Sequence, residues 1–178
     1  MRRTDPVAFP SLPAPPKPTA TRNAVVTVAR PDPGDFATLR NLTVTGSTLS
    51  IAVPPGTYGV FVANGGASIL LGVPGAVTPA VYNLQGLRLN TGSHLEIVGP
   101  VIVTAAGTSV INGTAGDAAN LDWLRLQLPK GALTVSATST LNGHVVVPAG
   151  LVTVAGRING RVTSDRITVP LTGSVHQD

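Results

Sequence analysis

The sequence of 178 residues contains no cysteine and very few aromatic residues. Without cysteine, disulfide bonds, cysteine-ligated zinc sites and thiol catalysis are excluded. Aromatic residues make up only 3% of the chain, so aliphatic side chains have to build the core. There are one glutamate and two lysines, against 24 valines and 21 threonines. Because glutamate and lysine suit exposed helix faces while valine and threonine suit pleated strands, this composition excludes a helical bundle and predicts an all-β chain.

Charged residues are also scarce, at 11% of the chain, and the positive excess is concentrated near the N-terminus. Six basic and three acidic residues lie within residues 1–40, whereas the rest of the chain is close to neutral. Binding to nucleic acid requires a stripe of Lys and Arg residues with aromatic side chains that stack on bases. The sequence has neither feature, so we expect no nucleic-acid partner.

No run of 18 or more uninterrupted apolar residues occurs, because proline and glycine break the most apolar stretch, residues 51–82. The sequence therefore predicts no transmembrane helix. The basic start, Met1-Arg2-Arg3, is similar to the first part of a signal peptide, but the apolar segment that should follow it is missing. We expect either a cytoplasmic chain or a mature form from which a leader has been removed.

Eight of the 16 prolines lie within the first 33 residues, and they predict an extended N-terminal arm over residues 1–37. Proline fixes φ and lacks a backbone donor, so residues 10–18 are expected to be polyproline-like. A strand-like segment follows at about residues 23–30. We expect this strand either to cap its own chain or to add to the edge of a neighbouring subunit. The residues that would make such an addition are Val25, Val26, Thr27 and Val28.

The body, residues 38–178, consists of short apolar runs that are closed by glycine or by Asn-Gly. Asn-Gly normally predicts a hairpin, but glycines recur every four to six residues over residues 145–169, which leaves almost no strand to pair. The coils of a solenoid need only such short strands, because each strand pairs with the coils above and below it. We therefore predict a single-domain parallel β-helix of about six or seven coils, at roughly twenty residues each. A β-sandwich is the alternative.

Apolar and polar residues alternate within the strands, as a β-helix requires. Leu124 and Leu126 are expected to face the core, and Arg125 between them to face the solvent. Residues 74–79 and 114–120 interrupt the pattern and are expected to bulge from the stack as loops.

The glycine-punctuated run at residues 131–169 resembles bactofilins, which are bacterial cytoskeletal β-helix proteins that polymerise end to end without nucleotide. Residues 156–169, together with the terminal His176-Gln-Asp178, also resemble β-helix-like modules of secreted pilus-associated and surface-anchored bacterial proteins. Residues 82–113 fit this surface group better. The two resemblances cover roughly residues 80–178 and imply a β-helix with a structural role.

A solenoid has two open ends, and their strand edges must be capped or must stack on another molecule. With so few charges to oppose stacking, we expect a non-enzymatic structural subunit that self-assembles through β-edges into a filament or surface layer. Its expected location is extracellular or at the cell surface. The alternatives are a bactofilin-like cytoplasmic polymer and a monomeric adhesin that binds a surface glycan or protein.

Candidate residues for chemistry are few. Asp117 and Asp122 flank one short loop and are the single plausible carboxylate pair for cleavage of a glycosidic bond, which needs two carboxyl groups. Their simpler interpretation is a pair of solvated loop acids, one of which caps a turn. Trp123, the only tryptophan, is either a platform for a ligand or partner or part of the loop packing. The three histidines lie too far apart for a recognised metal spacing, so we predict no metal, cofactor or catalytic residue.

Overall fold

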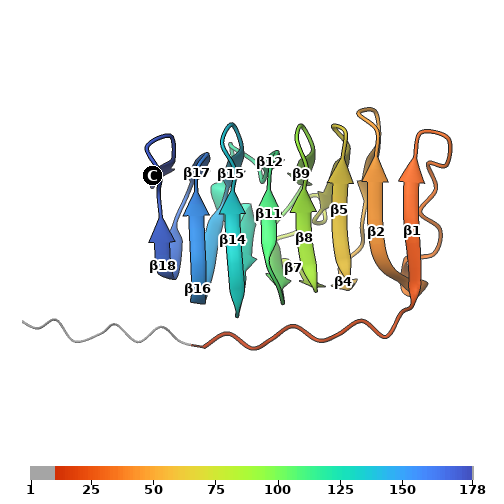
Figure 1. Cartoon of the computed structure of the whole chain (residues 1–178). Helices are drawn as coiled ribbons and strands as arrows, with labels where there is room; N and C mark the ends of the chain where they lie inside the picture. The colour runs from red at the N-terminus through yellow and green to blue at the C-terminus, as the bar shows by residue number, and fades with distance from the viewer. Residues whose placement is uncertain (1–10, 178) are drawn as a thin grey trace, which may run out of the picture.

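The structure, a computed structural model, describes residues 11–177, which form one parallel β-helix (Figure 1). The strands pair in parallel with strands of the preceding and following coils. The prediction of an all-β parallel β-helix is therefore confirmed, and the β-sandwich alternative is wrong. The stack has about eight turns, more than the six or seven expected. No helix among the described residues is long and apolar enough to cross a membrane.

A complete coil contributes one strand to each of three faces, which we call faces A, B and C. Face A contains β1 (Arg22–Thr27), β2 (Leu39–Thr45), β5 (Val60–Asn64), β8 (Gly86–Leu89), β11 (Ser109–Ile111) and β14 (Gly131–Val135). Face B contains β3 (Ser50–Ala52), β6 (Ser68–Leu71), β9 (His94–Ile97), β12 (Thr114–Ala115), β15 (Thr140–Asn142), β17 (Arg157–Asn159) and β19 (Ser174–His176). Face C contains β4 (Gly56–Thr57), β7 (Ala80–Leu84), β10 (Val101–Ala105) and β13 (Leu124–Gln127).

Two long strands, β16 (His144–Val154) and β18 (Val162–Thr168), pass around the corner from face C to face A. The first part of β16 pairs with β13, and its last part pairs with β14. The two remaining elements are short 3-10 turns, η1 (Phe36–Thr38) and η2 (Leu121–Trp123). The expected loop at residues 74–79 is present between β6 and β7, whereas the loop expected at residues 114–120 begins only after β12.

Side chains that point inward from successive coils stack in rows, and these rows form the core. The completely buried row on face A consists of Val26, Val44, Ala63, Leu89, Ile111, Val135 and Val154. The row on face B consists of Ile51, Ile69, Leu95, Ala115, Leu141, Ile158 and Val175. On face C, Leu124 and Leu126 are buried and Arg125 is exposed, as the alternation predicted.

Polar side chains form a second kind of row at the corners. Asn64 Nδ2 donates a hydrogen bond to Thr45 Oγ1 at 3.2 Å, and Asn90 of the next coil donates to Asn64 Oδ1. In the same way, Asn159 Nδ2 donates to Asn142 Oδ1 at 2.7 Å. An asparagine amide contains both a donor and an acceptor, so one residue type can continue such a row from coil to coil. The Asn-Gly pairs of the sequence are therefore corners of the coil rather than hairpin turns.

The first strand belongs to the stack rather than to a separate arm. β1 pairs in parallel with β2 of the same chain, and the inward-facing Ala24 and Val26 are buried. The expected boundary between arm and body at residues 37 and 38 therefore lies too late, because strand pairing and core burial begin at Arg22. This additional strand also accounts for part of the larger number of turns.

The loop between β1 and β2 covers the N-terminal end of the stack (Figure 1). Arg22 holds this loop in place, because its guanidinium group donates to the carbonyl oxygens of Pro33 at 2.8 Å and Asp35 at 2.5 Å. Asp35 Oδ1 accepts a hydrogen bond from the backbone N–H of Ala37 at the start of η1. Phe36 then packs against the hydrophobic core. The apolar side chains of the first coil are thereby removed from solvent.

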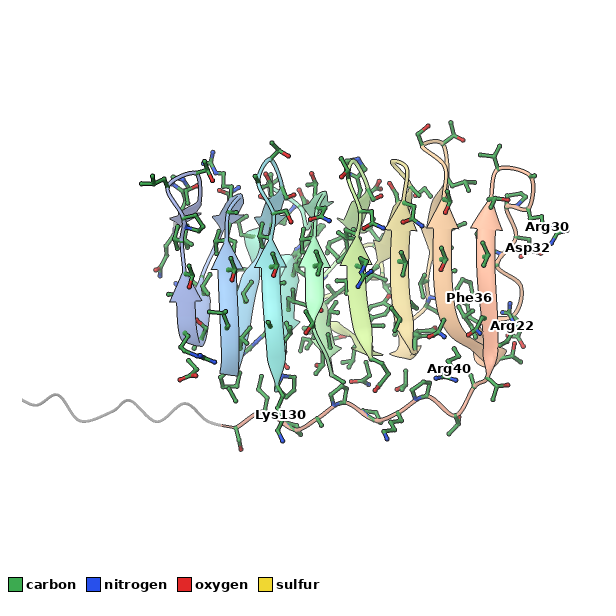
Figure 2. All side chains as sticks on the ribbon, in the orientation of Figure 1. Arg22, Arg30, Asp32, Phe36, Arg40 and Lys130 are labelled. Atoms are coloured by element: carbon green, nitrogen blue, oxygen red, sulfur yellow. The ribbon has the colours of Figure 1, made fainter. Side chains whose placement is uncertain are left out.

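Residues 11–21 form an extended strap that runs along the corner between faces C and A (Figure 1). Gln85 Nε2 donates to the carbonyl oxygen of Pro16 at 3.0 Å, and Pro15 is buried. Figure 2 shows Arg40 and Lys130 on the side of the stack along which the strap runs. Proline suits this position, because a strap that crosses the strands has no ladder hydrogen bond to donate.

Removal of residues 1–20 is expected to lower the free energy of unfolding by about 1–3 kcal/mol relative to removal of residues 1–10, because the burial of the strap is lost. Removal of residues 1–34 is expected to cost clearly more, because it also deletes β1 and uncovers the row that contains Val44. Urea denaturation followed by circular dichroism measures all three truncations. Equal stability of the two shorter truncations would show that the strap contributes nothing to the fold.

Candidate functional site

The C-terminal end of the stack exposes apolar side chains that continue the core rows. Ile167 is in register with the buried Val152 on face A, and Val175 is in register with the buried Ile158 on face B. Their exposed fractions are nevertheless 49% and 37%, because no further coil covers them. Val169, at 45%, and Leu171, which is fully exposed, add to the same surface. We call these four residues the C-terminal apolar surface.

Strand edges are also open at this end. Within residues 11–177, β18 pairs only with β16, and β19 pairs only with β17. The other edge of each strand therefore presents backbone N–H and C=O groups that are able to pair with a further strand. At the N-terminal end the edge strand β1 is accompanied by the covering loop, and its inward side chains are buried. The two ends of the solenoid are thus chemically different.

The residues expected to donate a strand to a neighbour lie in β1 or directly after it. Val25, Val26 and Thr27 pair with Thr43, Val44 and Thr45 of β2 in their own chain. Val26 is completely buried, whereas Val25 and Val28 are each 64% exposed. The edge of β1 that faces away from β2 is what remains for pairing with another subunit.

The two candidate carboxylates do not converge on one site. Asp117 Oδ1 accepts from the backbone N–H of Ala119 at 2.9 Å, and its Oδ2 accepts from Asn120 Nδ2 at 2.7 Å. The Asn120 hydrogen bond, followed by the Ala119 hydrogen bond, lowers the pKa of Asp117 from its ordinary value. Asp117 thus stabilises its own turn, which is the simpler of the two interpretations that the sequence allowed. Asp122 points to a different partner.

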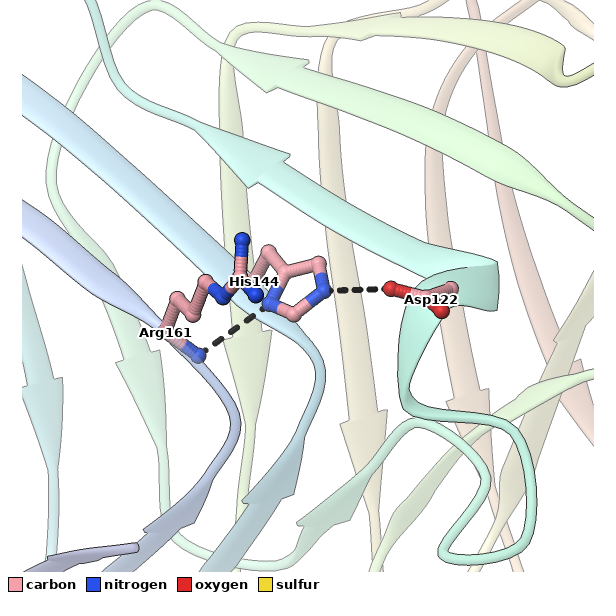
Figure 3. A network of polar contacts seen from close by, with 3 residues as sticks. All are labelled: Asp122, His144 and Arg161. Atoms are coloured by element: carbon pink, nitrogen blue, oxygen red, sulfur yellow. Dashed lines mark hydrogen bonds and ion pairs between the residues drawn. The ribbon is translucent and has the colours of Figure 1, made fainter. Parts of the chain in front are cut away.

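Asp122 forms an ion pair with His144 on the neighbouring coil (Figure 3). Its Oδ1 lies 2.7 Å from His144 Nε2, while His144 Nδ1 accepts the backbone N–H of Arg161 at 3.1 Å. Because Nδ1 accepts, Nε2 carries the hydrogen and donates it to the carboxylate. The imidazole is therefore held by hydrogen bonds from two coils. Trp123, beside Asp122, is half-buried and packs against the core.

A shallow hollow of about 230 Å³ lies beside this contact on face C. The residues that line it are Arg125, His144, Val145, Val146, Arg161 and Thr163. Neither Arg125 nor Arg161 was expected to be functional, and no local signal marks them. The parallel register alone brings them together, because it places residues of successive coils next to each other.

Within the described part of the chain, no three His, Asp or Glu side chains gather in a way that could hold a metal ion. His94 lies on β9 of face B and His144 on face C, so the two histidines are not stacked on one face. Comparisons with known protein families, curated proteins and solved structures found no significant match to this chain. The functional argument therefore rests on the two surfaces described above.

Proposed function

We propose that this chain is a non-enzymatic structural subunit that assembles with copies of itself through the C-terminal apolar surface. The observation that carries the proposal is the difference between the two ends: the core rows are covered at the N-terminal end and end in exposed Ile167 and Val175 at the other. Solenoid proteins normally need a polar terminal repeat for solubility. A second copy supplies the missing cover.

Contact between two C-terminal ends is the arrangement that best matches this surface. Apolar side chains then pack on identical apolar side chains across a two-fold axis, which is the commonest symmetry of protein dimers. The same axis pairs the two β18 edges in an antiparallel manner. Asp165 and Arg166 are adjacent in that strand and exposed, so each Asp165 can lie opposite the other copy's Arg166. The pairing is therefore complementary in charge as well as in hydrophobicity.

Longer assemblies require a second contact, for which we propose the outer edge of β1. An edge strand presents unpaired backbone groups along its length, and Val25 and Val28 are exposed beside it. Repetition of the two contacts produces a filament or a surface layer. We place this assembly outside the cell or at its surface, because a chain of Thr, Val and Gly with almost no Lys or Glu is typical of extracellular fibres.

Sedimentation velocity at increasing protein concentration, together with electron microscopy, tests this assembly. We expect dimers and longer particles from the natural chain and monomers from the double variant Ile167→Asp/Leu171→Asp. The matched control is Val77→Asp, which adds the same charge at a side chain that is 93% exposed in the loop between β6 and β7. A natural chain that stays monomeric at every concentration contradicts the proposal and favours a monomeric adhesin.

Cross-linking separates contact between two C-terminal ends from head-to-tail stacking. Because the chain contains no cysteine, Leu171→Cys introduces a single thiol that can form only an intermolecular disulfide. Rapid dimer formation on mild oxidation is expected for Leu171→Cys and not for Val77→Cys. If the two variants cross-link equally slowly, two C-terminal ends do not meet.

A further inference from the structure

Three nitrogen-rich side chains occupy successive coils on face C. Arg125 of β13 is in register with His144 of β16, and the pairing of Val145 with Val162 places Arg161 next in the same row. Adjacent parallel strands are separated by about 4.8 Å, so the α-carbons of the two arginines are about 10 Å apart. A ligand that extends along the axis of the solenoid can contact both guanidinium groups.

No acidic residue neutralises these arginines within residues 11–177. The ion pairs found there join His144 to Asp122 and Arg166 to Asp165. Arg161 contributes only its backbone N–H to His144, so its guanidinium group is not part of that contact. Both arginines are exposed on the surface. Their positive charges are therefore directed to solvent, where they attract an anion.

The surroundings of the two arginines are neither flat nor purely cationic. The hollow of about 230 Å³ has the apolar Val146 in its lining and Thr163, which provides a hydroxyl group. Asp122 stands at its edge through the His144 contact, and 95% of the Asp122 side chain is exposed. The site thus offers guanidinium donors, a carboxylate acceptor, a hydroxyl group and an apolar surface within one hollow.

We propose that this hollow binds an anionic polysaccharide. Carboxylate or sulfate groups of the sugar accept hydrogen bonds from Arg125 and Arg161, in the charge-assisted geometry that arginine favours. A sugar hydroxyl donates to Asp122, and a ring face packs on Val146. A polyanion without hydroxyl groups gains nothing from Asp122 and is repelled by its charge. His144 is a positioning residue, because both of its ring nitrogens are already used to hold Asp122 and the next coil.

Isothermal titration calorimetry at physiological ionic strength tests the site with defined probes. These are a galacturonate hexamer, a heparin hexasaccharide, inorganic polyphosphate and neutral maltohexaose. We expect binding of at least one acidic oligosaccharide and a loss of about tenfold or more in affinity for each of Arg125→Ala and Arg161→Ala. The control is Arg88→Ala, which removes the same charge from an exposed position on face A. All of these side chains are exposed, and circular dichroism verifies the fold of each variant.

Asp122→Ala distinguishes a sugar site from a general anion patch. We expect this variant to weaken binding of the acidic oligosaccharide and to strengthen any binding of polyphosphate. Binding of the galacturonate or the heparin probe alone supports the proposal and identifies carboxylate or sulfate as the recognised group. The proposal is overturned if neither probe binds, if Arg88→Ala reduces affinity equally, or if Asp122→Ala strengthens binding of every anion. Because the monomer carries the complete site, these outcomes are independent of the self-assembly experiments.

Discussion

Replacement of Gly113 by alanine is expected to prevent stable folding of the β-helix. A Cβ atom at residue 113 would lie 1.9 Å from the carbonyl oxygen of Ser93 in the preceding coil. This oxygen accepts a hydrogen bond from the backbone N–H of Thr114 at 3.0 Å, so the two coils cannot separate without losing it. The Gly113 carbonyl oxygen also accepts from Thr140 at 3.1 Å on the opposite side. Relief of the clash would therefore break contacts with both neighbouring coils.

The expected cost is several kcal/mol, which approaches the total stability of about 5–15 kcal/mol for a domain. The matched control is Gly86→Ala, since Gly86 is also buried but a Cβ atom there has its nearest neighbour at 3.7 Å. Urea denaturation followed by circular dichroism compares the two variants with the natural chain. We expect Gly86→Ala to unfold close to the natural midpoint and Gly113→Ala to be largely unfolded without urea. Equal midpoints would mean that the distance between coils at this corner is not a limit.

Phe61→Ala is expected to lower the free energy of unfolding by about 3–5 kcal/mol, the usual cost of removing a buried phenylalanine. Phe61 is completely buried, and it stacks between Leu42 and Leu87 of the adjacent coils. Its ring centroid lies 5.1 Å from that of Tyr58, in a tilted arrangement. A chain with only three phenylalanines has no second aromatic ring in this row to refill the space.

The comparison for Phe61→Ala is Val60→Ala in the same strand. Val60 faces outward and is 40% exposed, so its truncation is expected to cost less than about 1 kcal/mol. Chemical denaturation gives the free energy of unfolding for both variants. A cost for Phe61→Ala no greater than that for Val60→Ala would show that the inward rows do not provide the main stabilisation.

Local sequence patterns were sufficient to predict the fold. Strands of a few residues bounded by glycine cannot pair as hairpins, and the alternation at Leu124, Arg125 and Leu126 separates core from solvent. The number of turns was less predictable, because coil length varies. Phe61 and Leu87 are 26 residues apart but in register, whereas Val152 and Ile167 are in register at 15 residues. A sequence period of roughly twenty therefore gave too few turns.

The candidate sites were harder to predict for the same reason. Asp117 and Asp122 are close in sequence, but side-chain geometry gives the first to its own turn and the second to His144. Arg125 and Arg161 are distant in sequence and have no motif, yet the strand register aligns them on one face. Proximity along the chain was thus a poor guide to proximity in a stack where each coil contacts only its neighbours.

Composition, proline placement and the spacing of glycine by themselves determined an all-β solenoid with an extended N-terminal segment, because these are properties of local backbone conformation. Only the tertiary structure decided which strand begins the stack, which end is covered and which side chains share a face. These features depend on burial and on the register between coils, which arise when strands from distant parts of the sequence pair. The exposed end at Ile167 and the arginine pair on face C are both consequences of that pairing.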